Sequence, residues 1–259
     1  MCNYKIARIN WLDISKGIAI ILMIIGHSSL PKSISNFIWA FHMPLFFIAS
    51  GWTTNFCKYN FGGFIKQKSK TLLIPFAIYS IIILIIQCYE EINDPMFFLS
   101  NGWVSYALWF IPVLYLGLLC AKAIFSIKSI SFRYFALISV FVIGIGLSSY
   151  NIHFPWSLSS VPYATVFIIL GSEIKRFLSQ YIQPKWYNII LLFVVTLLIS
   201  HFWRLDMCFN SILPVIPITI GAISGTLMAF MISMLVEKHF KLLTKFNYYL
   251  YNNRQKYTV

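Results

Sequence analysis

Charged side chains are scarce in this sequence of 259 residues. Lys, Arg, Asp and Glu together make up 10% of it, whereas hydrophobic residues make up 59%, and the mean hydropathy is +0.77. A soluble domain carries roughly 25% charged residues, because its surface must be hydrated. Twenty Lys and Arg with seven Asp and Glu are too few to cover a globule of this size. The composition therefore excludes a soluble enzyme and a disordered chain, and it predicts an integral membrane protein.

Motifs of several common binding sites are also missing. The cysteines number five, and Cys57 and Cys120 lie in or beside apolar runs, so we expect no disulfide framework. There is no glycine-rich phosphate loop and no Cys/His cluster with zinc spacing, so we expect neither a metal nor a bound cofactor. The formal net charge is +13, but in so apolar a chain Lys and Arg more often set membrane topology than bind nucleic acid. Any chemistry must therefore lie among the helices.

Apolar runs long enough to form membrane-spanning helices occur eight times. A helix needs about 20 mainly apolar residues to cross the hydrocarbon core. No small-residue cleavage site follows the first run, so we interpret it as a permanent span rather than a signal peptide. The predicted spans are residues 14–29, 37–56, 72–88, 103–121, 134–150, 155–172, 186–203 and 212–236.

The basic residues divide unevenly between the two ends of these spans. With the N-terminus placed inside, all the Lys and Arg except Lys32 and Arg204 fall on the inner side. Cytoplasmic loops of membrane proteins carry such an excess of positive charge. The sequence therefore predicts an all-α integral membrane protein. It would be a polytopic helical bundle of about eight transmembrane helices, with cytoplasmic N- and C-termini.

The first two predicted spans hold four ionisable residues: Asp13, Lys16, His27 and His42. Lys16 and His27 are eleven residues apart, which is about 20° past three full turns of a helix and a rise of about 16 Å. Both side chains therefore project from one face, and Asp13 lies on the same stripe. Because a polar group inside a membrane is expensive, each of these residues suggests a function.

His42 is expected at a depth similar to that of His27. The turn between the first two spans centres near residues 32–35, and the two histidines lie about equally far on either side of it. Two imidazoles facing one cavity could deprotonate a hydroxyl and orient an acyl group. Structural alternatives remain open: Lys16 could extend to the lipid headgroups, Asp13 could cap the first helix, and His42 could bond locally at a helix start.

Other polar residues have simpler interpretations. His153, His201, Arg204 and Asp206 lie at outer helix ends, where exposure at the membrane interface explains them, and His239 lies in a basic cytoplasmic run. Before the third span, Lys66, Lys68 and Lys70 could hold a phosphorylated ligand. The same three lysines could instead only set topology and bind anionic lipid headgroups.

Three short stretches in the first fifty residues resemble a known family. They are residues 13–20 (DISKGIAI), 26–27 (GH) and 41–47 (FHMPLFF), and weaker pieces continue in order to about residue 240. Together they are similar to membrane acyltransferase family 3, and in particular to its fucose 4-O-acetylase-like branch of bacterial carbohydrate O-acetyltransferases.

The resemblance implies an activity and a set of roles. An acyl-CoA, usually acetyl-CoA, would be the co-substrate, and the acceptor would be a hydroxyl of a cell-surface carbohydrate or its lipid-linked precursor. His27 and His42 would be catalytic, and Asp13 would orient Lys16 or the first turn. Binding of the donor would fall to Lys16, Lys66, Lys68 and Lys70. The expected partners are acyl-CoA, the carbohydrate, the lipid bilayer and polysaccharide-biosynthesis proteins, with no nucleic acid.

The end of the sequence departs from the family pattern of about ten spans. We expect residues 1–246 to form the membrane-embedded acyltransferase domain and residues 247–259 a polar cytoplasmic tail, consistent with a truncation. Two alternatives to an active acyltransferase therefore stay open. One is a polytopic transporter or flippase whose buried polar groups line a pathway, and the other is an inactive, truncated acyltransferase remnant.

Overall fold

The computed structural model describes residues 9–89 and 107–255. Over these residues the chain is almost entirely helical, and the only pairing of β type is an isolated bridge between Asp206 and Ser211. The helices are α1 (Asn10–Gly26), α2 (Lys32–Thr53), α3 (Phe61–Lys68), η1 (Ser69–Leu73), α4 (Ile74–Tyr89), η2 (Ala107–Trp109), α6 (Phe110–Ser126), α7 (Ile130–Ser149), η3 (Pro155–Ser160), α8 (Val161–Glu173), η4 (Ile174–Leu178), α9 (Trp186–Phe202) and α10 (Val215–Gln255).

Five of the described helical segments are long and apolar enough to cross a membrane: Lys32–Thr53, Phe61–Ile86, Ile130–Ser149, Pro155–Phe177 and Val215–Phe240. Two shorter apolar helices, Phe110–Ser126 and Trp186–Phe202, accompany them. The protein is therefore an all-α polytopic membrane protein, as its composition predicts. Each predicted span overlaps a helix, although residues 103–106 of the fourth lie outside the described residues. The count of eight spans and the cytoplasmic termini stay predictions.

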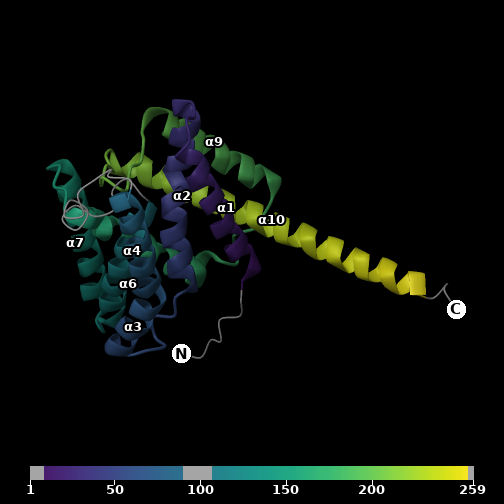
Figure 1. Cartoon of the computed structure of the whole chain (residues 1–259), viewed down its shortest axis with the longest axis horizontal. Helices are drawn as coiled ribbons and strands as arrows, with labels where there is room; N and C mark the ends of the chain where they lie inside the picture. The colour runs from purple at the N-terminus through teal and green to yellow at the C-terminus, as the bar shows by residue number, and fades with distance from the viewer. Residues whose placement is uncertain (1–8, 90–106, 256–259) are drawn as a thin grey trace.

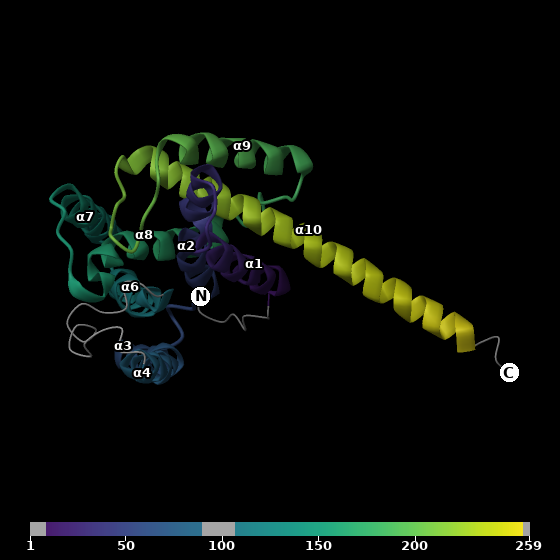
Figure 2. The ribbon, with the colours of Figure 1, turned by 45° about the horizontal axis from the view of Figure 1, so that its top comes forward.

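Helix α2 lies at the centre of the bundle and contacts α1, α8, α9 and α10. Figure 1 shows α1 and α2 beside each other, with α3, α4, α6 and α7 to one side and α10 extending away on the other. In the turned view, α9 runs along α10 across the top of the molecule (Figure 2). Most of α2 is buried, including His42 near its middle. Groups carried by α2 are thus held by neighbours on several sides.

Two glycines allow α2 and α8 to approach backbone to backbone. A Cβ added to Gly51 of α2 would overlap the carbonyl oxygen of Ile168, and a Cβ added to Gly171 of α8 would overlap that of Ile48. Small residues at such crossings let membrane helices pack closely, where dispersion rather than water exclusion drives association. This reciprocal contact fixes how α2 sits against α8.

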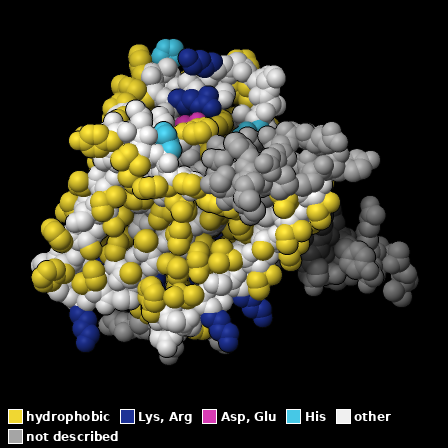
Figure 3. Space-filling view, turned by 60° about the vertical axis from the view of Figure 1, so that its left-hand side comes forward, with side chains coloured by type: hydrophobic (Ala, Val, Ile, Leu, Met, Phe, Trp, Pro, Cys, Tyr) yellow, Lys and Arg dark blue, Asp and Glu magenta, His cyan; other side chains and the backbone are white. Residues whose placement is uncertain are grey.

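The outward faces of several helices are apolar. Large exposed hydrophobic side chains cover α4, α7 and α9, and the segment containing α4 has almost no buried residue. Figure 3 shows a broad hydrophobic band on one face, with Lys and Arg along its lower edge and a group of charged and His side chains above it. Lipid, rather than water, is the medium that such a surface suits.

We predict that Gly171→Ala destabilises the protein by about 1–3 kcal/mol or more, because the added methyl group forces α8 away from the Ile48 carbonyl. The fraction of detergent-solubilised protein that stays monodisperse after heating measures the effect. Gly146→Ala in α7 is the matched control, since its Cβ meets no atom within 4 Å and Ala is the better helix former. Equal thermal stability of the two variants would contradict the close crossing.

Candidate functional site

The two histidines of the first helix pair line one cavity of about 60 Å³. His27 directly follows α1, where its backbone N–H closes the helix on the carbonyls of Met23 and Ile24. His42 lies in the middle of α2, so its interpretation as a helix-start residue is wrong. We call this space the histidine cavity. It is lined by Met23, His27, Trp39, His42, Met43, Trp109, Leu205, Met207, Cys208 and Phe209.

The histidine cavity has a buried end and an exposed end. His42, Met43 and Met207 are no more than 5% exposed. By contrast, Phe209 is 51% exposed and His27 is also classed as exposed. A substrate can therefore reach His27 from outside, whereas any group beyond His42 must fit inside the protein.

Backbone contact fixes the tautomer of His42. Its Nδ1 lies 2.9 Å from the carbonyl oxygen of Ile38, one turn earlier in α2. A carbonyl only accepts, so Nδ1 carries the proton and the neutral ring has its lone pair on Nε2. His42 can thus accept a proton or a hydrogen bond through Nε2. While it stays neutral, that nitrogen cannot donate to a carbonyl oxygen.

Trp39 connects the two histidines. Its ring makes edge-on contacts with His27 and His42, with ring centroids 5.7 and 5.8 Å apart. The indole Nε1–H donates to the Gly26 carbonyl at 3.3 Å, and the Arg204 guanidinium lies 4.0 Å from the ring centroid. Sequence reasoning missed Trp39. Its place three residues before His42, on the same helical turn, is the signal that could have found it.

The loop between α9 and α10 forms one wall of the histidine cavity. Asp206 shapes it: its carboxylate accepts from the N–H groups of Cys208 and Phe209 at 3.1 and 3.4 Å, and its backbone pairs with Ser211. Burial raises the pKa of the Asp206 carboxyl, while the hydrogen bond from Phe209 and the nearby Arg204 oppose that shift. Arg204 and Asp206, predicted to be merely interfacial, thus belong to the surroundings of the cavity.

Cys208 presents a thiol rather than a thiolate. Burial raises the pKa of this thiol to about 11, and its sulfur lies 3.5 Å from the hydroxyl oxygen of Ser157. The thiolate is the nucleophilic form of cysteine. At neutral pH, Cys208 therefore contributes to the wall of the cavity and is a poor nucleophile.

At the other end of α1 and α2, lysines gather where α2 finishes. The Lys68 ammonium lies 3.3 Å from the hydroxyl of Thr54 and within electrostatic range of Lys16. Lys175 donates to the Trp52 carbonyl at 2.9 Å. We call Lys16, Thr54, Lys68 and Lys175 the lysine end. Lys175 is one of the inner-side basic residues, for which the sequence indicates only a part in topology.

The three lysines before the third span do not act alike. Lys68 is partly buried at the lysine end, whereas Lys66 and Lys70, on the same stretch of helix, are exposed. Successive residues of a helix turn by 100°, so positions two apart face nearly opposite sides. Of the three, the structure places only Lys68 beside Lys16.

Asp13 is not the cap of α1. The N-cap position is Ile9, and Asp13 lies in the first turn with its side chain exposed and within electrostatic range of Lys16. The face predicted to carry Asp13, Lys16 and His27 is only partly buried. Leu12, Ser15 and Ala19, on the neighbouring face, are fully buried. Lys16 and His27 thus lie at the border between the core and the outside.

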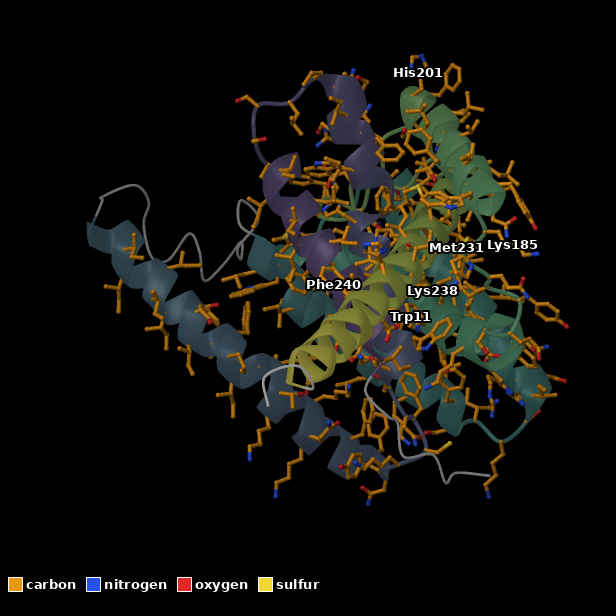
Figure 4. All side chains as sticks on the ribbon, turned by 90° about the vertical axis from the view of Figure 1, so that its right-hand side faces the viewer. Trp11, Lys185, His201, Met231, Lys238 and Phe240 are labelled. Carbon is orange, nitrogen blue, oxygen red and sulfur yellow. The ribbon has the colours of Figure 1, made fainter. Side chains whose placement is uncertain are left out.

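The remaining histidines lie apart from this arrangement. Figure 4 shows His201 at the tip of α9, at the top of the view and well above Trp11 and Phe240. His153 contacts Phe209 at the edge of the loop, with ring centroids 6.5 Å apart. Within residues 9–89 and 107–255, no group of three His, Cys, Asp or Glu side chains converges as metal ligands would.

Comparison with known proteins identifies the family. No curated protein and no solved structure matches the chain. A family model described as an acyltransferase domain, that of the acyltransferase 3 family, matches residues 9–251 and so includes both histidines, both walls of the cavity and the lysine end. The chain belongs to the membrane acyltransferase family 3.

Proposed function

We propose that the protein is an integral membrane O-acyltransferase of the cell inner membrane. It moves an acetyl group from acetyl-CoA to a hydroxyl of a cell-surface carbohydrate or its lipid-linked precursor. One observation carries this proposal: the α1–α2 pair has two imidazoles on a cavity at one end, and Lys16 of α1 meets Lys68 and Lys175 of other helices at the other end. Family membership supports the acyl transfer itself.

The spacing of the two ends suits a CoA thioester. Lys16 and His27 are separated by about 16 Å along α1, a length comparable with the extended pantetheine arm of CoA. At the lysine end, Lys16 and Lys68 are near enough to repel each other, and a phosphate between them would relieve that repulsion. The donor would lie along α1 with its phosphates there and its thioester in the histidine cavity.

The chemistry follows from the two imidazoles. The acceptor hydroxyl enters at the exposed end, where His27 removes its proton as a general base. The hydroxyl oxygen bonds to the thioester carbon, the carbon–sulfur bond breaks, and the CoA thiolate takes the proton from the His27 imidazolium. His42, whose Nε2 only accepts while neutral, orients the hydroxyl by accepting from it or from its neighbour. Trp39, which is partly exposed and contacts His27, suits the apolar face of a sugar ring at the exposed end.

We predict that His27→Ala lowers acyl transfer at least a hundredfold, because general base catalysis contributes about 10²–10⁴ in rate. His42→Asn should lower it about a hundredfold, because the hydroxyl loses the acceptor that orients it. An Asn side chain can keep the donor to the Ile38 carbonyl while removing the Nε2 lone pair. Transfer of radiolabel from acetyl-CoA to carbohydrate in membranes measures the rate. His201→Ala is the matched control, since this side chain lies at the tip of α9 (Figure 4).

Two results would count against the roles given to the histidines. Full activity of the His27→Ala variant would show that His27 is not the general base. Activity of His42→Asn equal to that of His201→Ala would show that the Nε2 lone pair of His42 takes no part.

A second prediction concerns the donor. Lys68→Ala should raise the KM for acetyl-CoA about tenfold, as expected for a lost charge-assisted contact of about 1.4 kcal/mol. Lys70→Ala removes the same charge two residues away, on the exposed side of the helix, and should change this KM less than twofold. Equal effects of the two substitutions would mean that the lysines act only through overall charge.

A further inference from the structure

We propose that Met43 and Met207 set the length of the acyl group by closing the buried end of the histidine cavity. Only acyl groups of two or three carbons would then fit. This inference rests on the proposed function and adds to it the residues that choose among acyl-CoA donors.

The first step is the size of the cavity. A cavity of about 150 Å³ binds benzene, which has six carbons. By this comparison the histidine cavity, at about 60 Å³, has room for two or three carbons, which is an acetyl or propionyl group.

The second step is the direction in which the tail must point. The acceptor hydroxyl needs the exposed end, where His27 lies and where Phe209 is 51% exposed. The tail is therefore directed to the buried end. There Met43 is 5% exposed, and Met207 and its neighbour Leu205 are each 2% exposed, so a longer chain meets protein on that side. If the chain turned back towards His27, it would occupy the place of the hydroxyl.

The third step explains why Met207 resists displacement. Methionine side chains are flexible, but the loop that carries Met207 is tied to the bundle at several points. The hydroxyl of Ser160 donates to the Met207 carbonyl. Asn210 donates to the Gly144 carbonyl at 3.4 Å, and the N–H of Ile212 donates to the hydroxyl of Ser148, also at 3.4 Å. With its backbone anchored to α7 and η3, the loop cannot easily retreat from a longer acyl chain.

The fourth step concerns the opposite wall. Met43 belongs to α2 and directly follows His42, whose ring is held by the Ile38 carbonyl. Helix α2 is itself fixed by its close crossing with α8. The two methionines thus extend from two anchored backbones into the same buried end, and truncating either one should add space where the tail needs it.

The test compares acyl-CoA donors within one preparation of the full chain in membranes. The kcat/KM for acetyl-, propionyl- and hexanoyl-CoA is measured for the wild type, Met207→Ala, Met43→Ala and Met207→Phe. In the wild type we expect hexanoyl transfer at least a hundredfold below acetyl transfer. Met207→Ala and Met43→Ala should each raise the hexanoyl-to-acetyl ratio at least tenfold, while Met207→Phe should lower the propionyl-to-acetyl ratio.

The control is Met231→Ala, which truncates a buried methionine of α10 that does not line the cavity (Figure 4). Its donor ratios should match those of the wild type. Ratios taken within one preparation do not depend on the folded fraction, so a poorly folding variant still gives an answer.

The outcomes separate the two claims. Wild-type protein that transfers acetyl and hexanoyl groups equally well would overturn the role of the methionines and leave the acyltransferase intact. The role of the methionines would also be overturned if Met207→Ala and Met43→Ala had the same hexanoyl-to-acetyl ratio as Met231→Ala. No transfer from any thioester would overturn the proposed function, and this inference with it.

Discussion

The backbone contact between α2 and α8 is the constraint on which the proposed site depends. Gly51 and Gly171 each admit the carbonyl oxygen of the other helix, which leaves α2 little freedom to shift or rotate. His42, Trp39 and Met43 all belong to α2, and its last residues meet the lysine end. A displacement of this one helix would therefore disturb the cavity and the lysine end together.

Elsewhere in the bundle, several buried hydroxyl and ammonium groups are satisfied by the backbone. The hydroxyls of Thr165, Thr196 and Thr226 each donate to the carbonyl four residues earlier in the same helix. Lys122 donates to two loop carbonyls, at 2.6 and 2.9 Å. Such pairing removes the cost of a polar group in a membrane and needs no function. His42 differs, because one ring nitrogen is paired with the backbone and the other is left for the cavity.

Hydropathy predicts the helices well, because a helix that crosses the hydrocarbon core needs about 20 mainly apolar residues. Each predicted span overlaps a helix of the structure, with bounds shifted by a few residues at most ends. The pairing of His27 with His42 could be expected from the antiparallel turn between α1 and α2. Helical periodicity also separates Lys68 from Lys66 and Lys70, although the three lysines form one basic run in the sequence.

The remaining parts of the site depend on contacts between distant segments. Met207 and Cys208 reach the cavity only because the loop after α9 folds back and bonds to η3 and α7. Such a contact joins residues that are far apart in the sequence, so no local sequence pattern predicts it. For the same reason, Arg204 looked interfacial, whereas in the structure it lies over the Trp39 ring.

The placement of the donor is the central claim of this account, and photolabelling tests it most directly. The probe is a non-transferable thioether analogue of a short acyl-CoA with a diazirine at the end of its acyl chain, irradiated in membranes and mapped by mass spectrometry. We expect the label on α2 near Met43 or on the loop near Met207, and we expect excess acetyl-CoA to abolish it. Label confined to α4, α7 or α9, or label that acetyl-CoA does not displace, would contradict the account.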